Sequence, residues 1–259
     1  MDIYASAYLE GKDKTFDEEK LKSIKGIDLK NVNILSSYFY VKDIPIKERI
    51  KQYGLFLLDS GAFTFLSKEK ARAGVDWDEY VESYAKYITD NDIKLFMELD
   101  IDLLVGLKKV EMLRYKLERM TGKKPIPVWH KGRGKEGFIR MCENYPYVAV
   151  GGIVTHEIPR HIYEKMFPWF INTAHKHGAK IHGLGVSTET GIRKVKFDSV
   201  DNTDWTYGAK CGFIYRFFPD EMRMRKTYAK DGMKLADTKD AATRNLGEFI
   251  KSIMFAKKL

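Results

Sequence analysis

Short apolar runs alternate with longer amphipathic segments along this chain, and this alternation is the feature that most constrains its fold. The apolar runs are rich in β-branched, aromatic and Leu residues, which is typical of strands buried on both faces of a sheet. They cover 32–41, 55–59, 93–100, 125–130, 147–151, 180–185 and 195–200, with an eighth run either near 3–8 or at 213–217. Helical periodicity lies between them, at 77–89, 103–120 and 159–177. Strands alternating with helices predict right-handed βαβ units and a parallel sheet.

Eight such strands predict a closed (β/α)8 barrel of the α/β class, and 259 residues suit one such domain spanning 1–259. An open doubly wound sheet is the alternative, but the chain has neither GxGxxG at a first strand–helix turn nor GxxxxGK[ST]. The charged segment 220–245 is either a lid or substrate-contact segment, or a solvated surface. The stretch 246–259 predicts an amphipathic closing helix.

Several functional classes find no support in the sequence. No apolar run approaches the roughly 20 residues that span a bilayer, and no basic leader precedes an apolar core at the N-terminus. Cys142 and Cys211 are too few for a disulfide framework, which favours a reducing, cytoplasmic setting. The six histidines include no HExxH motif and the cysteines stand alone, so we expect neither a metal nor another cofactor.

The formal net charge of +9 favours a polyanionic partner, because Lys and Arg neutralise phosphates. A surplus that only keeps the protein soluble is the alternative interpretation. Basic residues cluster after two predicted strands: Lys131, Arg133 and Lys135, and then Arg216, Arg223, Arg225 and Lys226. We expect Lys131 and Arg133 to contact a nucleic-acid backbone.

Acids, histidines and glycines recur where the predicted strands end. In a parallel barrel, functional side chains gather at the carboxyl ends of the strands. These positions are Asp59, Glu98, Asp100, Asp102, His130, Gly151, Gly152, His182, Gly183, Gly185, Asp198 and Asp201. Two opposed carboxylates suit glycosidic chemistry, in which one attacks the anomeric carbon and the other moves a proton. Each acid could instead be a helix N-cap, and the nearby aromatics Phe63, Trp129 and Trp205 either stack a base or pack in the core.

Four short motifs resemble those of the tRNA-guanine transglycosylases, also called queuine tRNA-ribosyltransferases. The Asp-Ser-Gly-Ala-Phe at 59–63 is similar to the Asp-Ser-Gly-Gly-Phe of that family, and 150–153 is similar to its Gly-Gly-Leu step. The segment 182–186 resembles its Met-Gly-Val-Gly strand, and 197–199 resembles the Phe-Asp-Cys or Phe-Asp-Ser that carries its nucleophile. The motifs occur in the order of the family over about residues 55–205.

The resemblance implies a barrel enzyme that exchanges a guanine-type base for a 7-deazaguanine-type base in DNA or tRNA. Its partners would be the nucleic acid and a small-molecule base. Asp198 would attack C1′, Asp59 would be the general acid/base, and Asp100 would recognise the base. The other base-binding positions implied are Ser60, Gly61, Phe63, His130, Gly151, Gly152, His182 and Gly183.

The sequence also departs from that family. The Cys-x-Cys-x-x-Cys zinc motif is absent, and 199–205 is closer to smaller, zinc-less, DNA-associated or phage-type members. The Phe-Asp alignment favours Asp198 as the nucleophile. The second pattern favours Asp201, which stays open as the alternative. Two further alternatives stay open. One is a hydrolytic DNA glycosylase on the same barrel, and the other is an unrelated phosphosugar-type barrel or a non-catalytic binding protein.

Overall fold

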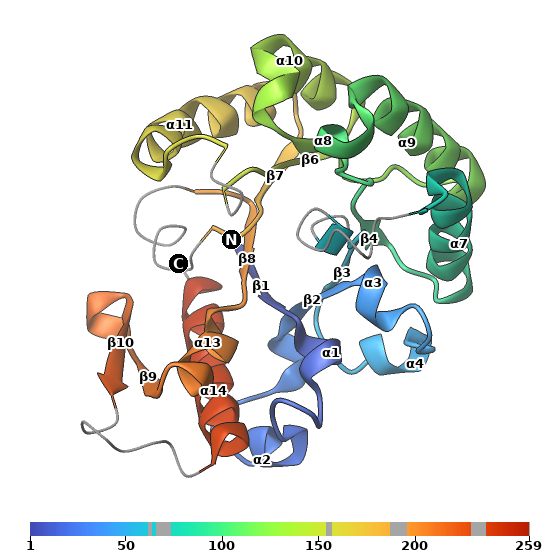
Figure 1. The fold of residues 1–259 in the computed structure, drawn as a ribbon. Helices are drawn as coiled ribbons and strands as arrows, with labels where there is room; N and C mark the ends of the chain where they lie inside the picture. Colours follow the sequence, from blue (N-terminus) through green and yellow to red (C-terminus); the bar gives the residue numbers. More distant parts are fainter. Residues whose placement is uncertain (62–63, 66–73, 154–156, 187–195, 229–236, 259) are drawn as a thin grey trace. The chain divides into compact units, whose positions relative to one another are not determined.

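Eight parallel strands alternate with helices in the computed structural model, which describes residues 1–61, 64–65, 74–153, 157–186, 196–228 and 237–258 (Figure 1). The strands are β1 Asp2–Ser6, β2 Asn33–Ser37, β3 Phe56–Asp59, β4 Leu95–Phe96, β5 Val128–Trp129, β6 Tyr147–Val150, β7 Lys180–Gly183 and β8 Ser199–Asn202. They form one sheet in the order β4-β3-β2-β1-β8-β7-β6-β5. A parallel bridge between Met97 and Ile126 links the two ends of that order. The predicted (β/α)8 class is confirmed.

Of the two candidates for the eighth strand, the segment near residue 3 is the one in the parallel sheet. Residues 213–217 instead lie in β9 Phe213–Phe218, which pairs antiparallel with β10 Arg223–Tyr228 in a separate two-stranded sheet. The burial pattern of β9 explains the difference, because only every second residue of this strand is buried. A strand covered on both faces would be buried throughout.

The chain divides into two compact units, and the first contains residues 1–35, 52–55 and 185–259. In it, β1 pairs in parallel with β8 and with residues 33–35. Its helical segments are α1 Tyr8–Gly11, α2 Glu18–Lys22, η1 Leu29–Asn31, α13 Asp204–Lys210, η3 Pro219–Glu221 and α14 Thr238–Ala256. Asp237 caps α14 by accepting from the Asp240 N–H, so this helix begins eight residues before the predicted closing helix. It packs against β1, α2, α13 and β9.

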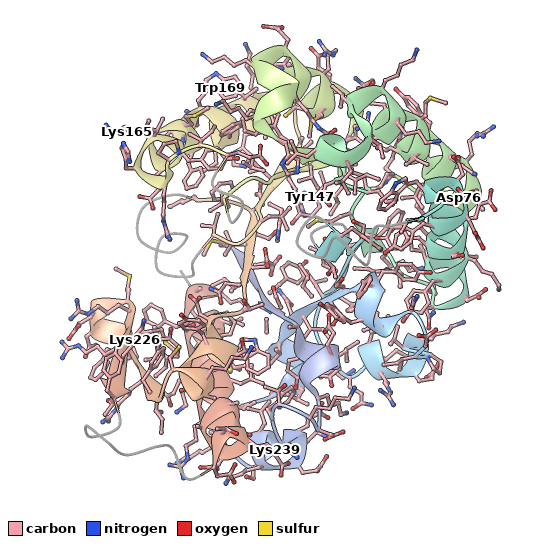
Figure 2. The ribbon with its side chains drawn as sticks, viewed as in Figure 1. Asp76, Tyr147, Lys165, Trp169, Lys226 and Lys239 are labelled. Atoms are coloured by element: carbon pink, nitrogen blue, oxygen red, sulfur yellow. The ribbon has the colours of Figure 1, made fainter. Side chains whose placement is uncertain are left out.

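The second unit contains residues 36–51 and 56–184. Its helical segments are α3 Tyr38–Val41, α4 Lys47–Ile50, α7 Trp77–Asp90, α8 Asp102–Val105, α9 Leu107–Thr121, η2 Lys131–Arg133, α10 Gly134–Asn144 and α11 Arg160–Lys176. Asp76, labelled in Figure 2, caps α7 by accepting from the N–H groups of Asp78 and Glu79. The helix predicted over 103–120 is two helices, because Gly106 lies between them with φ +79°.

Within the described ranges, no helix has the length and apolar character needed to cross a membrane.

Candidate active site

The carboxyl ends of β3 to β6 bring polar residues together within the second unit. Asp59 is the last residue of β3, and Asp100 lies four residues beyond the end of β4. His130 directly follows β5, and Gly151 directly follows β6. Parallel strands end at the same edge of a sheet, so this edge is the one where a barrel of this class builds its chemistry.

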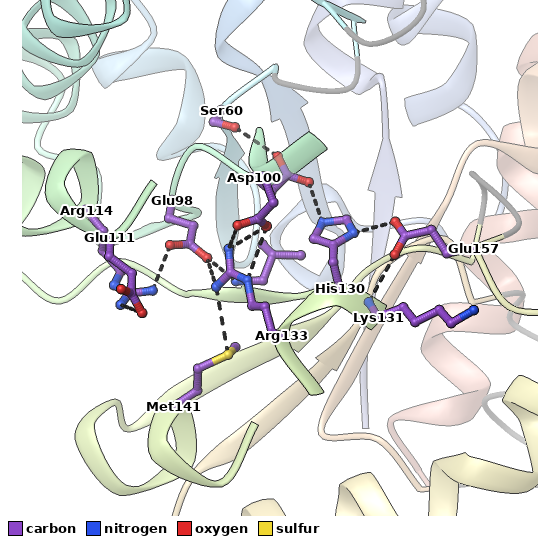
Figure 3. Close-up of polar contacts among 12 residues, drawn as sticks. Ser60, Glu98, Asp100, Glu111, Arg114, His130, Lys131, Arg133, Met141 and Glu157 are labelled. Atoms are coloured by element: carbon purple, nitrogen blue, oxygen red, sulfur yellow. Dashed lines mark hydrogen bonds and ion pairs between the residues drawn. The ribbon is translucent and has the colours of Figure 1, made fainter. Parts of the chain in front are cut away.

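His130 lies between two carboxyl groups (Figure 3). Its Nδ1 is 2.6 Å from Oε1 of Glu157, and its Nε2 is 3.5 Å from Oδ2 of Asp100. The His130 side chain is only 8% exposed. Among the described residues, Nε2 has no hydrogen-bond partner. Buried polar atoms nearly always have one, so this nitrogen marks a position where a ligand atom would fit chemically.

The two carboxyl groups change the protonation of His130. Burial alone would lower the pKa of the imidazole, because it penalises the charged ring. The nearby carboxyl groups of Asp100 and Glu157 outweigh that effect and raise the pKa to about 10. The ring is therefore an imidazolium at neutral pH, with a proton on Nε2.

Glu157 is a site residue that the sequence analysis missed. Its Oε1 contacts His130, its Oε2 accepts from the backbone N–H of Lys131 at 3.0 Å, and its own N–H donates to the Gly152 carbonyl at 3.2 Å. It lies seven residues beyond the end of β6, in the segment before α11. The rule that functional side chains follow strand ends pointed to the glycines after β6. The same rule, applied through the loop that follows them, also includes Glu157.

Gly151 and Gly152 make room for the His130–Glu157 pair. A Cβ on Gly151 would lie 2.8 Å from Cγ1 of Val128 and 3.0 Å from Cε1 of His130. Gly152 has φ +77°, and a Cβ there would lie 2.9 Å from Cδ of Glu157. The Gly151 N–H donates to the Trp129 carbonyl at 2.9 Å, so it is already used in the sheet. The base-binding role implied for Gly151 would therefore need a group other than this N–H.

The Asp-Ser-Gly segment after β3 forms a tight turn beside Asp100. Oδ2 of Asp59 accepts from the Gly61 N–H at 3.0 Å, and Oγ of Ser60 lies 3.5 Å from Oδ1 of Asp100. Gly61 has φ +83°. Burial and the charges of Asp59 and Asp100 raise the pKa of Tyr80, whose hydroxyl donates to the Ser60 carbonyl. The charges of both acids thus act on the same phenol.

Phe63, predicted to contact a base, lies outside the described residues. Two other predicted positions, His182 and Gly183, lie within β7, where they pair with Ala149 and Val150 of β6. The His182 side chain is fully buried. Of the segment 220–245, residues 229–236 also lie outside the described residues, and the rest lies in η3, β10 and α14 or at their ends.

Arg133 does not lie where a nucleic-acid backbone could reach it. Its side chain is only 3% exposed, and its guanidinium is paired with Glu98 and Asp102 at 2.8 Å each. The predicted backbone contact of Arg133 is therefore wrong, because both faces of its charge are used inside the protein. Lys131 has an exposed side chain, and its contact with a polyanion stays a prediction.

In the first unit, Asp198 lies at the opposite end of its strand from the one predicted. It precedes β8, and its carbonyl accepts from the Asp2 N–H at 2.8 Å. Asp201 lies within β8 and is 8% exposed. Its Oδ2 accepts from Oγ of Ser6 at 2.5 Å and its Oδ1 from the Gly185 N–H at 2.9 Å. Asp198 thus lies before the amino end of β8, opposite to the strand ends where a barrel of this class builds its chemistry.

Nothing in the described ranges groups three or more His, Cys, Asp or Glu side chains in a way that could hold a metal ion.

Comparison with known proteins does not identify a family for this chain. No protein-family model and no curated protein matches it. Among solved structures it is similar to "QR15, an Aldolase", at 12% sequence identity and a TM-score of 0.49 over 78% of this chain and 88% of that one.

No protein-family model matches this chain, that of the tRNA-guanine transglycosylases included, so the predicted family, including its zinc-less members, is wrong. The predicted base exchange in DNA or tRNA is wrong with it, and so is the hydrolytic DNA glycosylase. The positions of two residues assigned to that chemistry agree with this correction. Asp198 lies before the amino end of β8, and Arg133 is already paired with Glu98.

Proposed function

We propose that this protein is an enzyme that transfers protons to and from a small substrate at the carboxyl ends of β3 to β6, with His130 carrying the proton. One observation supports this more than any other. A buried, protonated imidazole nitrogen faces a carboxyl group at 3.5 Å and has no hydrogen-bond partner among the described residues.

The roles follow from the two ring nitrogens. Glu157 accepts a 2.6 Å hydrogen bond from the Nδ1–H of His130. This bond fixes the orientation of the ring, as a carboxylate does in other acid/base pairs with histidine. Nε2 then donates to the substrate. Asp100, on the far side of Nε2, accepts a proton from the same substrate group.

A hydroxyl group suits this pair of partners, because it accepts from one neighbour and donates to another. Protonation by His130 would let such an oxygen leave as water when its C–O bond breaks, and deprotonation by Asp100 would convert it to an alkoxide. Asp100 and Glu157 place a carboxyl group at each nitrogen of the imidazolium, so a substrate hydroxyl at Nε2 would lie within reach of both a proton donor and a proton acceptor.

The test begins with a thermal-shift screen of neutral, cationic and anionic small molecules that carry hydroxyl or carbonyl groups. Molecules that raise the Tm are then incubated with the protein in deuterium oxide, and proton NMR follows their conversion or their exchange of carbon-bound hydrogen. Wild-type protein is expected to catalyse one of the two. His130→Gln should slow the reaction by roughly 10²–10⁴-fold, the usual contribution of a positioned acid or base.

Lys135→Gln, on an exposed position of α10, is the matched control and should react like wild type. Ligands that bind to wild type and undergo neither conversion nor exchange would make the protein a binding protein. Equal rates in wild type and His130→Gln would remove His130 from the chemistry.

A further inference from the structure

Four charged side chains form a buried ion network beside the site, and the proposed mechanism does not use them. They are Glu98, Asp102, Arg114 and Arg133. Glu98 is fully buried, and the two arginines are 5% exposed or less. Burying charges is costly unless their partners are well placed, so the geometry of such a network is a strong constraint on the chain around it.

Arg133 holds the segment that carries Asp100 on both sides. Glu98 lies two residues before Asp100 and Asp102 lies two residues after it. Nη1 of Arg133 is 2.8 Å from Oε1 of Glu98, while Nη2 is 2.8 Å and Nε 3.2 Å from Oδ2 of Asp102 (Figure 3). One planar guanidinium therefore grips both flanks of the acid that faces His130.

The backbone of the same arginine belongs to the turn that starts at His130. The Arg133 N–H donates to the His130 carbonyl at 2.9 Å, which closes η2. Glu98 also reaches this segment, because its Oε1 accepts from the Val128 N–H at 2.6 Å, two residues before His130. The Asp100 segment and the His130 segment are thus joined through one side chain and one carboxylate.

We propose that Arg133 is a positioning residue that sets the separation between Asp100 and His130. The proposed function gives this separation its purpose, which is proton transfer between the substrate, His130 and Asp100. The positioning role itself does not depend on that function. Lysine cannot replace the arginine, because a single ammonium lacks the fork that meets Glu98 and Asp102 together.

Arg114 provides a matched control within the same network. Its Nη1 is 3.0 Å from Oε2 of Glu98, so it shares that carboxylate with Arg133. It lies in α9, and its ion pairs are with Glu98 and Glu111, not with Asp102. Arg114→Met removes a buried positive charge of the same kind but leaves the link between the Asp100 and His130 segments in place.

The experiment measures the pKa of His130 by NMR titration of the ring, with His130→Gln used to assign its signals. The variants are Arg133→Lys and Asp102→Glu, which keep the charges, together with Arg133→Met and Arg114→Met. Removing a nearby positive charge raises the pKa of a histidine by direct electrostatics. Moving Asp100 away from the ring lowers it, so the sign of the change separates the two effects.

We expect Arg133→Lys, Arg133→Met and Asp102→Glu to increase the acid-dissociation constant of His130 by about tenfold or more, one pKa unit. Arg114→Met should leave it unchanged or decrease it. An unchanged His130 in the charge-conserving variants, or an equal fall of its pKa in Arg114→Met, would overturn the positioning role. Because the titration needs no substrate, it gives its answer even if the proposed acid–base activity proves wrong.

Discussion

At the scale of the residue, His130 shows how neighbours can reverse the effect of burial. The ring is almost fully buried, which favours the neutral form, yet its pKa is raised to about 10 by Asp100 and Glu157. Its folded-state pKa therefore lies above the ordinary value of 6.5. Such a group stabilises the folded state fully below the ordinary pKa, and the stabilisation is lost as the pH rises through the folded-state pKa.

This linkage predicts how stability depends on pH in His130→Gln. We expect the variant to be less stable than wild type at pH 6, since Asp100 and Glu157 lose their cation. The difference should shrink as the pH rises from about 6.5 through about 10, where the wild-type ring loses its proton. Urea unfolding of both proteins at pH 6, 8 and 10 measures it. A difference that stays constant or grows with pH would show that the imidazolium is not what stabilises this site.

Gly151 gives a second prediction at the residue scale. Gly151→Ala places a methyl group against Val128 and the imidazole, and overpacking of this kind costs about 1–3 kcal/mol. Any turnover should also fall, because His130 must move. Gly132→Ala is the matched control, since a Cβ there meets nothing within 4 Å and it lies in the turn that starts at His130. Chemical denaturation compares the two, and equal stability of both variants would mean that the site relaxes freely around the methyl group.

At the scale of the element, β4 and β5 are only two residues long, and a side chain extends their pairing. Glu98 follows β4 and accepts the Val128 N–H at the start of β5, while also pairing with Arg114 and Arg133. An acid in this position thus serves both as a backbone acceptor and as the counter-charge of two arginines. The stability of this edge of the sheet should depend on it more than strand length suggests.

Glu98→Gln tests this dependence. The amide keeps the acceptor for Val128 but leaves two buried arginines short of a negative charge, which costs about 3–5 kcal/mol when a buried pair is broken. Glu111→Gln is the control: its carboxylate is 42% exposed and 3.9 Å from Arg114, and such surface pairs contribute about 0–1 kcal/mol. Urea unfolding at neutral pH distinguishes them. A loss of stability no larger than that of the control would show that the arginines find other partners.

Element boundaries also explain which parts of the site could be predicted. Seven apolar runs overlap seven of the eight strands, β1 was one of two candidates for the eighth, and the strand-end rule pointed to Asp59, Asp100 and His130. The strand-end rule failed at β8, where the predicted strand covers 195–200 and the observed one begins at Ser199. Apolar content alone does not fix the register of a strand. That shift moved Asp198 from the carboxyl end to the amino end. The burial of Arg133 was equally hidden, since its partners lie 31 and 35 residues away in the sequence.

At the scale of the whole molecule, the two units differ in how far apart in sequence their paired strands lie. In the second unit, β6 pairs with β7 across one helix, α11. In the first unit, β1 pairs with β8, and the hydrogen bond from Ser6 to Asp201 spans 195 residues. Closing a loop of that length costs more conformational entropy than closing one βαβ unit. Contacts distant in sequence also form more slowly.

This difference predicts the order of folding. On dilution from urea, amides of β6 and β7 should gain protection before those of β1 and β8, because the long closure must wait for structure that shortens it. Pulsed hydrogen–deuterium exchange with mass spectrometry follows peptides that cover 147–150, 180–183, 2–6 and 199–202. Ser6→Ala provides the check, since it removes a bond to Asp201 that exists only after the closure. It should speed unfolding while leaving the early protection of β6 and β7 unchanged. The opposite result would be protection of 2–6 and 199–202 before or together with that of β6 and β7. It would show that β1 and β8 pair without waiting for the rest of the sheet.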